Sequence, residues 1–217
     1  MAVFAIGIIA CGSDVEGNKA QAGEAEKATT PPLATETYMV GGNSSVQWVG
    51  SKRFVGGKHA GTLPMKSGRV EVADGKVVGG EILMDMTKIA NIDLEGDGKG
   101  QLEGHLMSAD FFDVENHPNA KFEIISAEPL AGVAGATHKV KGNLTLKGVS
   151  KSIEFNAKIN VSEGGVTASA PQFVIDRTQW GISYGSTDKE SVADDLKDRI
   201  ISNDIGISLN ITARKVM

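Results

Sequence analysis

The sequence predicts an all-β fold, an antiparallel barrel of about eight strands with a short helix and loop across one end. Apolar and polar residues alternate with a period of two in several runs, as in strands with one buried face. Glycine supplies 27 of the 217 residues, well above the usual ~7%, which suits many turns and strand kinks. About eight such strands can close into a barrel that holds one small ligand.

The alternation is clearest in three runs of the second half, Val140–Leu146, Ile153–Val161 and Ile205–Ala213. Each run has one dry and one wet face, which indicates antiparallel strands over a single interior. The remaining strand candidates are Val46–Phe54, Arg69–Ala73, Lys76–Met86, Phe122–Leu130 and Val166–Asp176.

Turn and break signals lie between these runs. Asp74-Gly75 predicts a type I′ hairpin, and Pro171 predicts an edge or a bulge in its strand. The alternation stops over Asn91–Pro118, where Leu102–Met107 is a candidate for a short helix.

The N-terminus differs in composition from the rest of the chain. Val3–Ala10 is a short apolar run before Cys11, the only cysteine. A run of this length is too short to cross a bilayer and is typical of the core of an export signal. The small residues before Cys11 resemble a bacterial lipoprotein cleavage box, so we expect lipidation there, although no Lys or Arg precedes the run. The alternative is an apolar N-terminus with a buried thiol.

Residues 12–36 are small and polar, and too poor in large apolar groups to offset the entropy of ordering, so they predict a flexible linker. The expected organisation is a lipoprotein signal peptide over residues 1–11, a linker over 12–36 and a barrel domain over 37–217. This arrangement predicts a lipid-anchored protein of the bacterial cell envelope, on the periplasmic side of a membrane or at the cell surface. A net charge of −5 gives no reason to expect nucleic acid as a partner.

The segment from His105 to Phe122 is neither a regular helix nor a regular strand. It reads as a loop that lies across the barrel mouth and sets Phe111 and Phe112 against the interior. Adjacent side chains diverge, so we expect one ring to pack as structure and the other to line the cavity. Two charges enter the lumen if their strand faces point inward, Lys52 and Arg177, and each would then need a carboxylate or a polar ligand head. For Lys52, an early strand end that leaves the charge in water is an equal alternative.

Three motifs resemble those of a known family. The residues His105-Leu106, Ser108, Asp110-Phe111-Phe112-Asp113, His117-Pro118 and Phe122 resemble the signature of the YceI-like family. Residues 142–151 resemble its strand-and-turn motif, and residues 173–181 resemble its stretch that ends in an aromatic residue and glycine. The resemblance covers Tyr38 to Ala213. Departures include Gln101–Gly104, where the family often has Arg-Asp, and the acidic insertion Thr187–Asp198.

The resemblance implies a lipocalin-like barrel, exported from the cytoplasm, that binds a polyisoprenoid or a similar long amphiphile such as an isoprenoid quinone. Its role would be carriage, storage or sensing, with no catalysis and no cofactor besides the bound lipid. The expected partners are this lipid and, through the anchor, a membrane; a homodimer is a further hypothesis. The candidate ligand-binding residues are Trp48, Lys52, His59, His105, Phe111, Phe112, Arg177 and Trp180.

Other chemistries are less well supported by the residues. Asp93, Glu95 and Asp97 resemble part of a calcium loop, but Gly104 stands where the bidentate Glu belongs. The four histidines lack metal-site spacing. The runner-up functions are a lipid-ester hydrolase in the same barrel, with His105, Ser108 and Asp110 as its candidate set, and an envelope structural module whose barrel is packed solid.

Overall fold

The computed structural model describes residues 15–28, 32 and 34–216 of the chain. Cys11 and the predicted export signal lie outside the described residues, and lipidation therefore stays a prediction.

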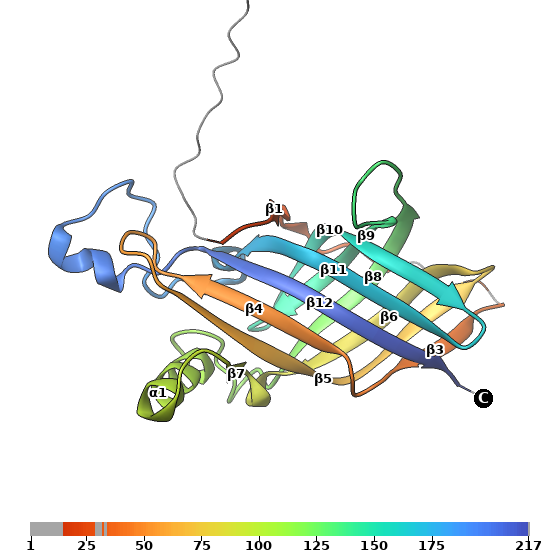
Figure 1. The fold of residues 1–217 in the computed structure, drawn as a ribbon, viewed down its shortest axis with the longest axis horizontal. Helices are drawn as coiled ribbons and strands as arrows, with labels where there is room; N and C mark the ends of the chain where they lie inside the picture. Colours follow the sequence, from red (N-terminus) through yellow and green to blue (C-terminus); the bar gives the residue numbers. More distant parts are fainter. Residues whose placement is uncertain (1–14, 29–31, 33, 217) are drawn as a thin grey trace, which may run out of the picture.

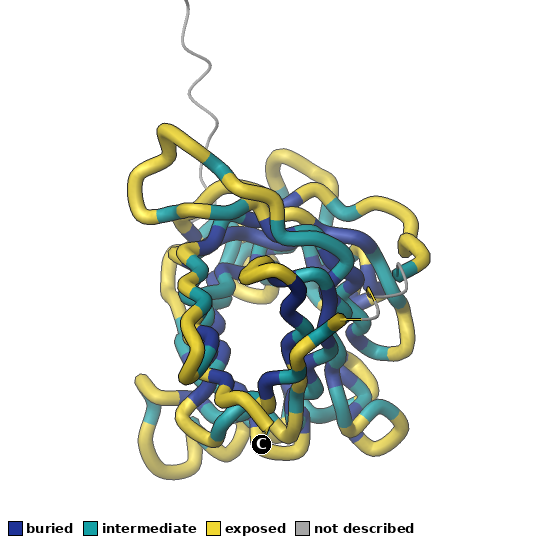
Figure 2. Tube along the Cα trace, turned by 90° about the vertical axis from the view of Figure 1, so that its right-hand side faces the viewer, coloured by how far each residue is buried: buried dark blue, intermediate teal, exposed yellow. Residues whose placement is uncertain are grey.

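The described residues form a closed antiparallel barrel, as the sequence predicts. The strands of the ring pair with one another in chain order. The first strand of the ring, β4 (Ser45–Ser51), pairs with the last, β12 (Asp204–Lys215), and so closes it. Figure 1 shows the long strands inclined to the barrel axis, and Figure 2, viewed from the C-terminal end, shows the trace closing into a ring. The ring consists of β4 (Ser45–Ser51), β5 (Lys58–Ala73), β6 (Lys76–Asp85), β8 (Asn119–Pro129), β9 (His138–Leu146), β10 (Val149–Ser162), β11 (Gly165–Asp176) and β12 (Asp204–Lys215).

The alternating pattern gives each strand its inward face. In β10, Ile153, Phe155 and Ala157 are buried while Glu154 and Lys158 are exposed. The inward residues of all the strands meet in one interior, because side chains alternate across a strand with a period of two.

Two local predictions are confirmed. Asp74 and Gly75 both have positive φ, 50° and 71°, as the two-residue turn between β5 and β6 requires. The register of β11 against β12 shifts between Ala170 and Phe173, which is the bulge expected at Pro171. Among the strands that were not candidates, β3 (Glu36–Val40) pairs with β5 and β12 and continues the line of β4.

A short helical cap lies at one end of the barrel. The helix α1 (Gly96–Met107) begins earlier than the predicted Leu102 and lies beside β7 (Ala90–Asn91), at the lower left of Figure 1. Three 3₁₀ turns complete this end: η1 (Met86–Lys88), η2 (Arg177–Trp180) and η3 (Asp194–Arg199). No helix within the described ranges combines the length and the apolar character that spanning a bilayer demands.

Part of the predicted linker packs on the barrel. Strands β10 and β11 pair with each other only over Lys158–Ser162 and Gly165–Ser169. Beyond that point, β1 (Asn18–Lys19) pairs with β11 and β2 (Gly23–Glu24) pairs with β10. The segment therefore fills the β10–β11 seam, and Figure 1 shows it running along these strands. The prediction of a flexible linker does not hold here, because backbone pairing with β10 and β11 and the burial of Ala20 hold the segment in place.

Candidate ligand-binding site

The barrel encloses an apolar cavity, here called the main cavity, with a volume of about 140 Å³. Its wall comes from nearly every strand of the ring and from the cap. The wall side chains are almost all aliphatic, methionine or phenylalanine; Val46, Leu63, Met84, Ile153, Ile175 and Leu209 are representative. Such a lining offers van der Waals contact to an apolar molecule and excludes water.

The cap closes the main cavity at the α1 end. Leu106, near the end of α1, and the two rings of Phe111 and Phe112 all belong to the cavity wall. Phe111 is 5% exposed and Phe112 is 9% exposed, so neither ring faces solvent. The ring centroids lie 5.1 Å apart in an edge-to-face arrangement. The expectation that only one ring lines the cavity is wrong, because the turns of residues 108–117 let neighbouring side chains point into the same space.

Arg177 follows the end of β11 and is fully buried in the cavity wall. Its guanidinium donates to three backbone carbonyls, Ser202 O at 3.0 Å, Ile182 O at 2.6 Å and Ile201 O at 3.2 Å. Burial lowers the pKa of Arg177 from its usual value, while Asp176 acts in the opposite direction. The side chain is therefore occupied in fastening the loop of residues 200–202 to η2.

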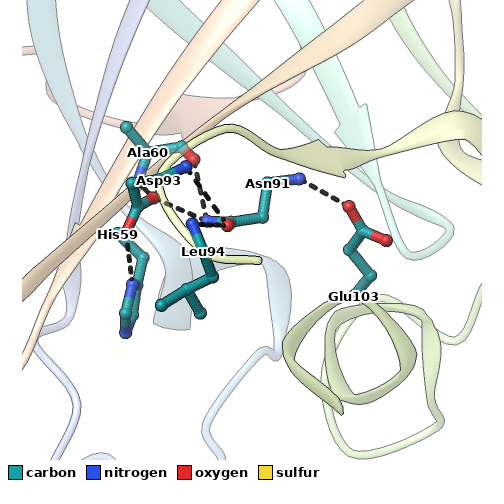
Figure 3. Close-up of polar contacts among 6 residues, drawn as sticks. All are labelled: His59, Ala60, Asn91, Asp93, Leu94 and Glu103. Atoms are coloured by element: carbon teal, nitrogen blue, oxygen red, sulfur yellow. Dashed lines mark hydrogen bonds and ion pairs between the residues drawn. The ribbon is translucent and has the colours of Figure 1, made fainter. Parts of the chain in front are cut away.

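A polar network, which we call the clasp, holds α1 against the barrel (Figure 3). Asn91 is fully buried; its backbone N–H donates to Glu103 Oε1 on α1 at 2.8 Å, and its Nδ2 donates to Ala60 O on β5 at 2.9 Å. Asp93 Oδ1 accepts from Ala60 N at 2.7 Å, and Asp93 Oδ2 lies 2.8 Å from His59 Nδ1. The clasp thus joins β5, β7 and α1.

The loop after α1 is fastened from the opposite side as well. Lys147 Nζ donates to Ala109 O at 2.8 Å, and the ring of His117 lies over Gly148, where a Cβ would come within 2.8 Å of His117 Cε1. The cap is therefore held on both sides of the mouth by side chains outside the cavity.

The eight sequence-predicted site residues separate into two sets of four. Trp48, Phe111, Phe112 and Arg177 lie in the wall of the main cavity, and the cavity brings them together. Trp48 lies across Gly61, which has no side chain to obstruct the indole, and Trp48 Nε1 is buried with no partner among the described residues.

The other four predicted residues lie outside the cavity wall. Lys52 follows the end of β4, and its Nζ donates to Asp198 O, so the strand ends before the charge reaches the lumen. His59 belongs to the clasp. Trp180 is fully buried and donates from Nε1 to Leu144 O at 2.9 Å, which is a packing role.

His105 lies behind the cavity wall at the mouth. Its ring makes edge contacts with Phe111, at 5.9 Å between centroids, and with Tyr184, at 4.6 Å. Its Nε2 is buried and has no hydrogen-bond partner within the described part of the chain. This end of the barrel therefore has a buried ring nitrogen without a partner among the described residues, next to a cavity-lining phenylalanine.

Several wall residues escaped the sequence reasoning. Met65, Met84 and Met86 line the cavity, and so does Ile201 from the loop before β12. Strand alternation could have found Met84. Ile201 carries no such signal, because its position depends on the carbonyl bonds to Arg177.

The contacts around the candidate catalytic set are structural. Ser108 Oγ donates to the backbone oxygen of His105 at 2.8 Å and closes the turn after α1. Among the described residues, no bond joins the Ser108 hydroxyl to the His105 ring, and no group of His, Cys, Asp and Glu side chains could hold a metal ion.

Comparison with known proteins finds a family model that spans nearly the whole barrel and a curated relative of a shorter stretch. The family model for the YceI-like domain matches residues 39–213. A curated relative, the UPF0312 protein of Pseudomonas putida, is 41% identical over 56 residues, which are 26% of this chain and 28% of that protein. The chain thus matches little more than a quarter of the length of that relative.

Solved structures share the fold at low sequence identity. BcnA of Burkholderia cenocepacia has a TM-score of 0.54 and 18% identity, covering 78% of this chain and 96% of BcnA. A polyisoprenoid binding domain from Saccharophagus degradans, implicated in plant cell wall breakdown, has a TM-score of 0.55 and 14% identity, covering 82% of this chain and 98% of that one.

Proposed function

The chain belongs to the YceI-like family, and from that premise we propose that its barrel binds the apolar chain of a polyisoprenoid or a similar long amphiphile. The observation that carries this proposal is the apolar main cavity inside the ring of strands. The polyisoprenoid binding of the similar Saccharophagus domain adds support for this ligand class.

The free energy of binding would come from burial of the chain. Each CH₂ removed from water contributes up to ~0.8 kcal/mol before ordering costs. Three methionines in the wall, Met65, Met84 and Met86, have unbranched side chains that can rearrange around an irregular chain. The volume of about 140 Å³ matches only a short stretch of chain, so a longer ligand requires the wall to adjust or leaves part of its length outside.

The polar end of the ligand belongs at the α1 end. Two buried nitrogen atoms there have no partner among the described residues, Trp48 Nε1 and His105 Nε2. A hydroxyl or carbonyl oxygen at this end would satisfy one of them, since burying a polar group without a hydrogen bond is costly. Arg177 is no longer the candidate for the head-group contact, because each of its three side-chain nitrogens already donates to a backbone carbonyl.

The two runner-up functions have less support. A hydrolase needs a nucleophile bonded to its base, whereas the Ser108 hydroxyl is used in a turn. A purely structural barrel would be packed throughout, whereas this interior holds a cavity.

The location is a further part of the proposal. Lipidation at Cys11 would hold the barrel at a membrane of the cell envelope, close to the source of such ligands. Several acyl chains are enough for stable anchoring, whereas one is marginal. The Cys11→Ser variant should then move from the membrane pellet to the soluble fraction; if it stays in the pellet after a high-salt wash, Cys11 is not the anchor.

Native mass spectrometry of the full chain, purified from its own envelope without detergent exchange, tests the function. We expect an adduct of one amphiphile per protein, identified after organic extraction. A protein that carries no adduct, and acquires none when mixed with envelope lipids, would contradict the proposal.

A further inference from the structure

The interior of the barrel is divided along its axis. A second apolar cavity, the minor cavity, has a volume of about 60 Å³ and lies towards the end opposite α1, between residues such as Val70, Val77 and Val166. The two cavities share part of their walls. The shared residues are Ile82, Phe122, Phe155, Leu209 and Ile211.

Two aromatic rings form the bulk of this shared wall. Phe122 on β8 and Phe155 on β10 have ring centroids 5.6 Å apart, and Phe155 stacks on Phe173 of β11 at 4.5 Å. Phe155 is 8% exposed, so its ring is held inside the barrel. We call the pair Phe122 and Phe155 the partition.

A glycine between the two strands makes the partition possible. Gly142 on β9 pairs with Ile124 of β8 on one side and with Ile153 of β10 on the other. A Cβ at this inward position would collide with Phe122 Cζ and lie 2.5 Å from Glu123 O. The missing side chain lets the Phe122 ring lie across β9 towards Phe155. The partition therefore depends on residues of three neighbouring strands, β8, β9 and β10.

We propose that the partition sets the length of apolar chain that the barrel accepts. This inference rests on the proposed function and adds a specificity determinant to it. A chain that enters from the α1 end fills the main cavity until its tail meets Phe122 and Phe155. Any further length stays near the mouth, because reaching the minor cavity would require the two rings to separate.

The consequence is a plateau in affinity. Each methylene that enters the main cavity tightens binding by up to about fourfold. Once the tail reaches the partition, additional units remain outside and contribute little. The dissociation constant should therefore fall with chain length and then level off.

The experiment measures displacement of a fluorescent fatty-acid probe by a series of prenols, from geraniol upward one isoprene unit at a time. Phe122→Ala should join the two cavities and move the plateau to chains longer by about one isoprene unit, because the lost ring has more carbons than one such unit. Phe122→Leu, a milder change, should move the plateau in the same direction. It tests the inference if the alanine variant folds poorly.

Two further variants make the result specific. Phe112 lines the main cavity and not the minor cavity. Phe112→Ala should therefore weaken binding of all prenols and leave the chain length at the plateau unchanged. Ala168 lines the minor cavity and not the main cavity. Ala168→Leu added to Phe122→Ala should fill the minor cavity and return the plateau to its wild-type chain length.

The outcomes separate this inference from the function beneath it. If the wild type binds none of the prenols, the proposed function fails and the inference with it. If the wild type binds them and the folded Phe122 variants level off at the same length as the wild type, the function stands and the partition does not set chain length.

Discussion

The guanidinium of Arg177 lies over the ring of Phe111, with Cζ 5.3 Å from the ring centroid. The contact joins η2 to the loop after α1, which are 66 positions apart in the sequence numbering. It also combines with three carbonyl bonds, so one buried cation fastens three segments at the mouth. Arg177 is therefore an organiser of the cap.

Arg177→Met should destabilise the protein strongly. The change leaves three carbonyls without their donor, and each buried group left unpaired costs ~1–3 kcal/mol. We expect a loss of several kcal/mol in the free energy of unfolding, measured by urea denaturation with fluorescence detection. Arg69 is a matched control, because it is half exposed and its ion-pair partners among the described residues are Glu71 and Glu81. Arg69→Met should cost no more than ~1 kcal/mol. Equal losses in the two variants would contradict the organising role.

The clasp should weaken in acid. Burial acts to raise the pKa of Asp93, but hydrogen bonds from the Ala60 backbone, His59 and Asn91 outweigh it and hold the pKa below the usual value. A lowered pKa means that the ionised form stabilises the fold. That contribution is complete above the ordinary Asp pKa, ~3.9, and is lost as the pH falls further.

Hydrogen exchange of the α1 amides between neutral pH and pH ~3.5 measures this effect. Protection factors, which correct for the intrinsic slowing of amide exchange in acid, should fall more in wild-type α1 than in Asp93→Asn, which should be less protected at neutral pH and less sensitive to acid. Identical pH profiles for the two proteins would show that Asp93 does not couple α1 to pH.

The N-terminal segment should act as a removable part of the wall. Ala20 is 7% exposed and packs with the core, and its N–H donates to Val174 O at 2.7 Å. A carboxylate at this position would be buried without a partner, so Ala20→Asp should detach the segment from the seam. We expect faster exchange in β10 and β11 beside the seam and faster release of a preloaded prenol. Gln21→Asp changes the next, exposed residue and should behave as the wild type; seam protection that is unchanged in Ala20→Asp would refute the packing.

The polar nitrogens at the mouth should affect head-group preference more than tail binding. His105→Phe removes the unpaired Nε2, and Trp48→Phe removes the unpaired Nε1. For each variant we compare a prenol with the hydrocarbon of equal length. The wild type should prefer the prenol, and at least one variant should lose that preference by a factor of about 10, the worth of one hydrogen bond. A preference that survives both changes would place the head elsewhere.

Most of the barrel could be predicted because its strands alternate strictly. Residues 153–161 of β10 keep the period of two throughout, and the interior side follows directly. The first half of β5 could not be recognised, because Gly61, Pro64 and Gly68 interrupt the pattern and the strand is irregular between Met65 and Ser67. The pairing of β1 with β11 and of β2 with β10 could not be predicted either, because it depends on an opening between two strands that are distant from this segment in the sequence.

The site was only partly accessible to sequence reasoning. The phenylalanine pair and Trp48 could be placed at the cavity because large apolar side chains in strands and caps turn inward. His59 and Lys52 could not be placed, because each ends in a bond to a residue far along the chain, Asp93 and Asp198. Arg177 was expected to need a carboxylate or a polar ligand head, and it pairs instead with backbone carbonyls.

Photo-crosslinking with a prenol that carries a diazirine at the tail end tests most directly whether the barrel interior holds the chain. After irradiation and digestion, the labelled residues should lie on the inward faces of several strands, among them Met84, Phe122 and Leu209 in the main-cavity wall. An excess of unlabelled prenol should remove the labelling. Labels confined to the outer surface or to the exposed loop around Leu196, with none on inward-facing residues, would show that the chain does not enter the barrel.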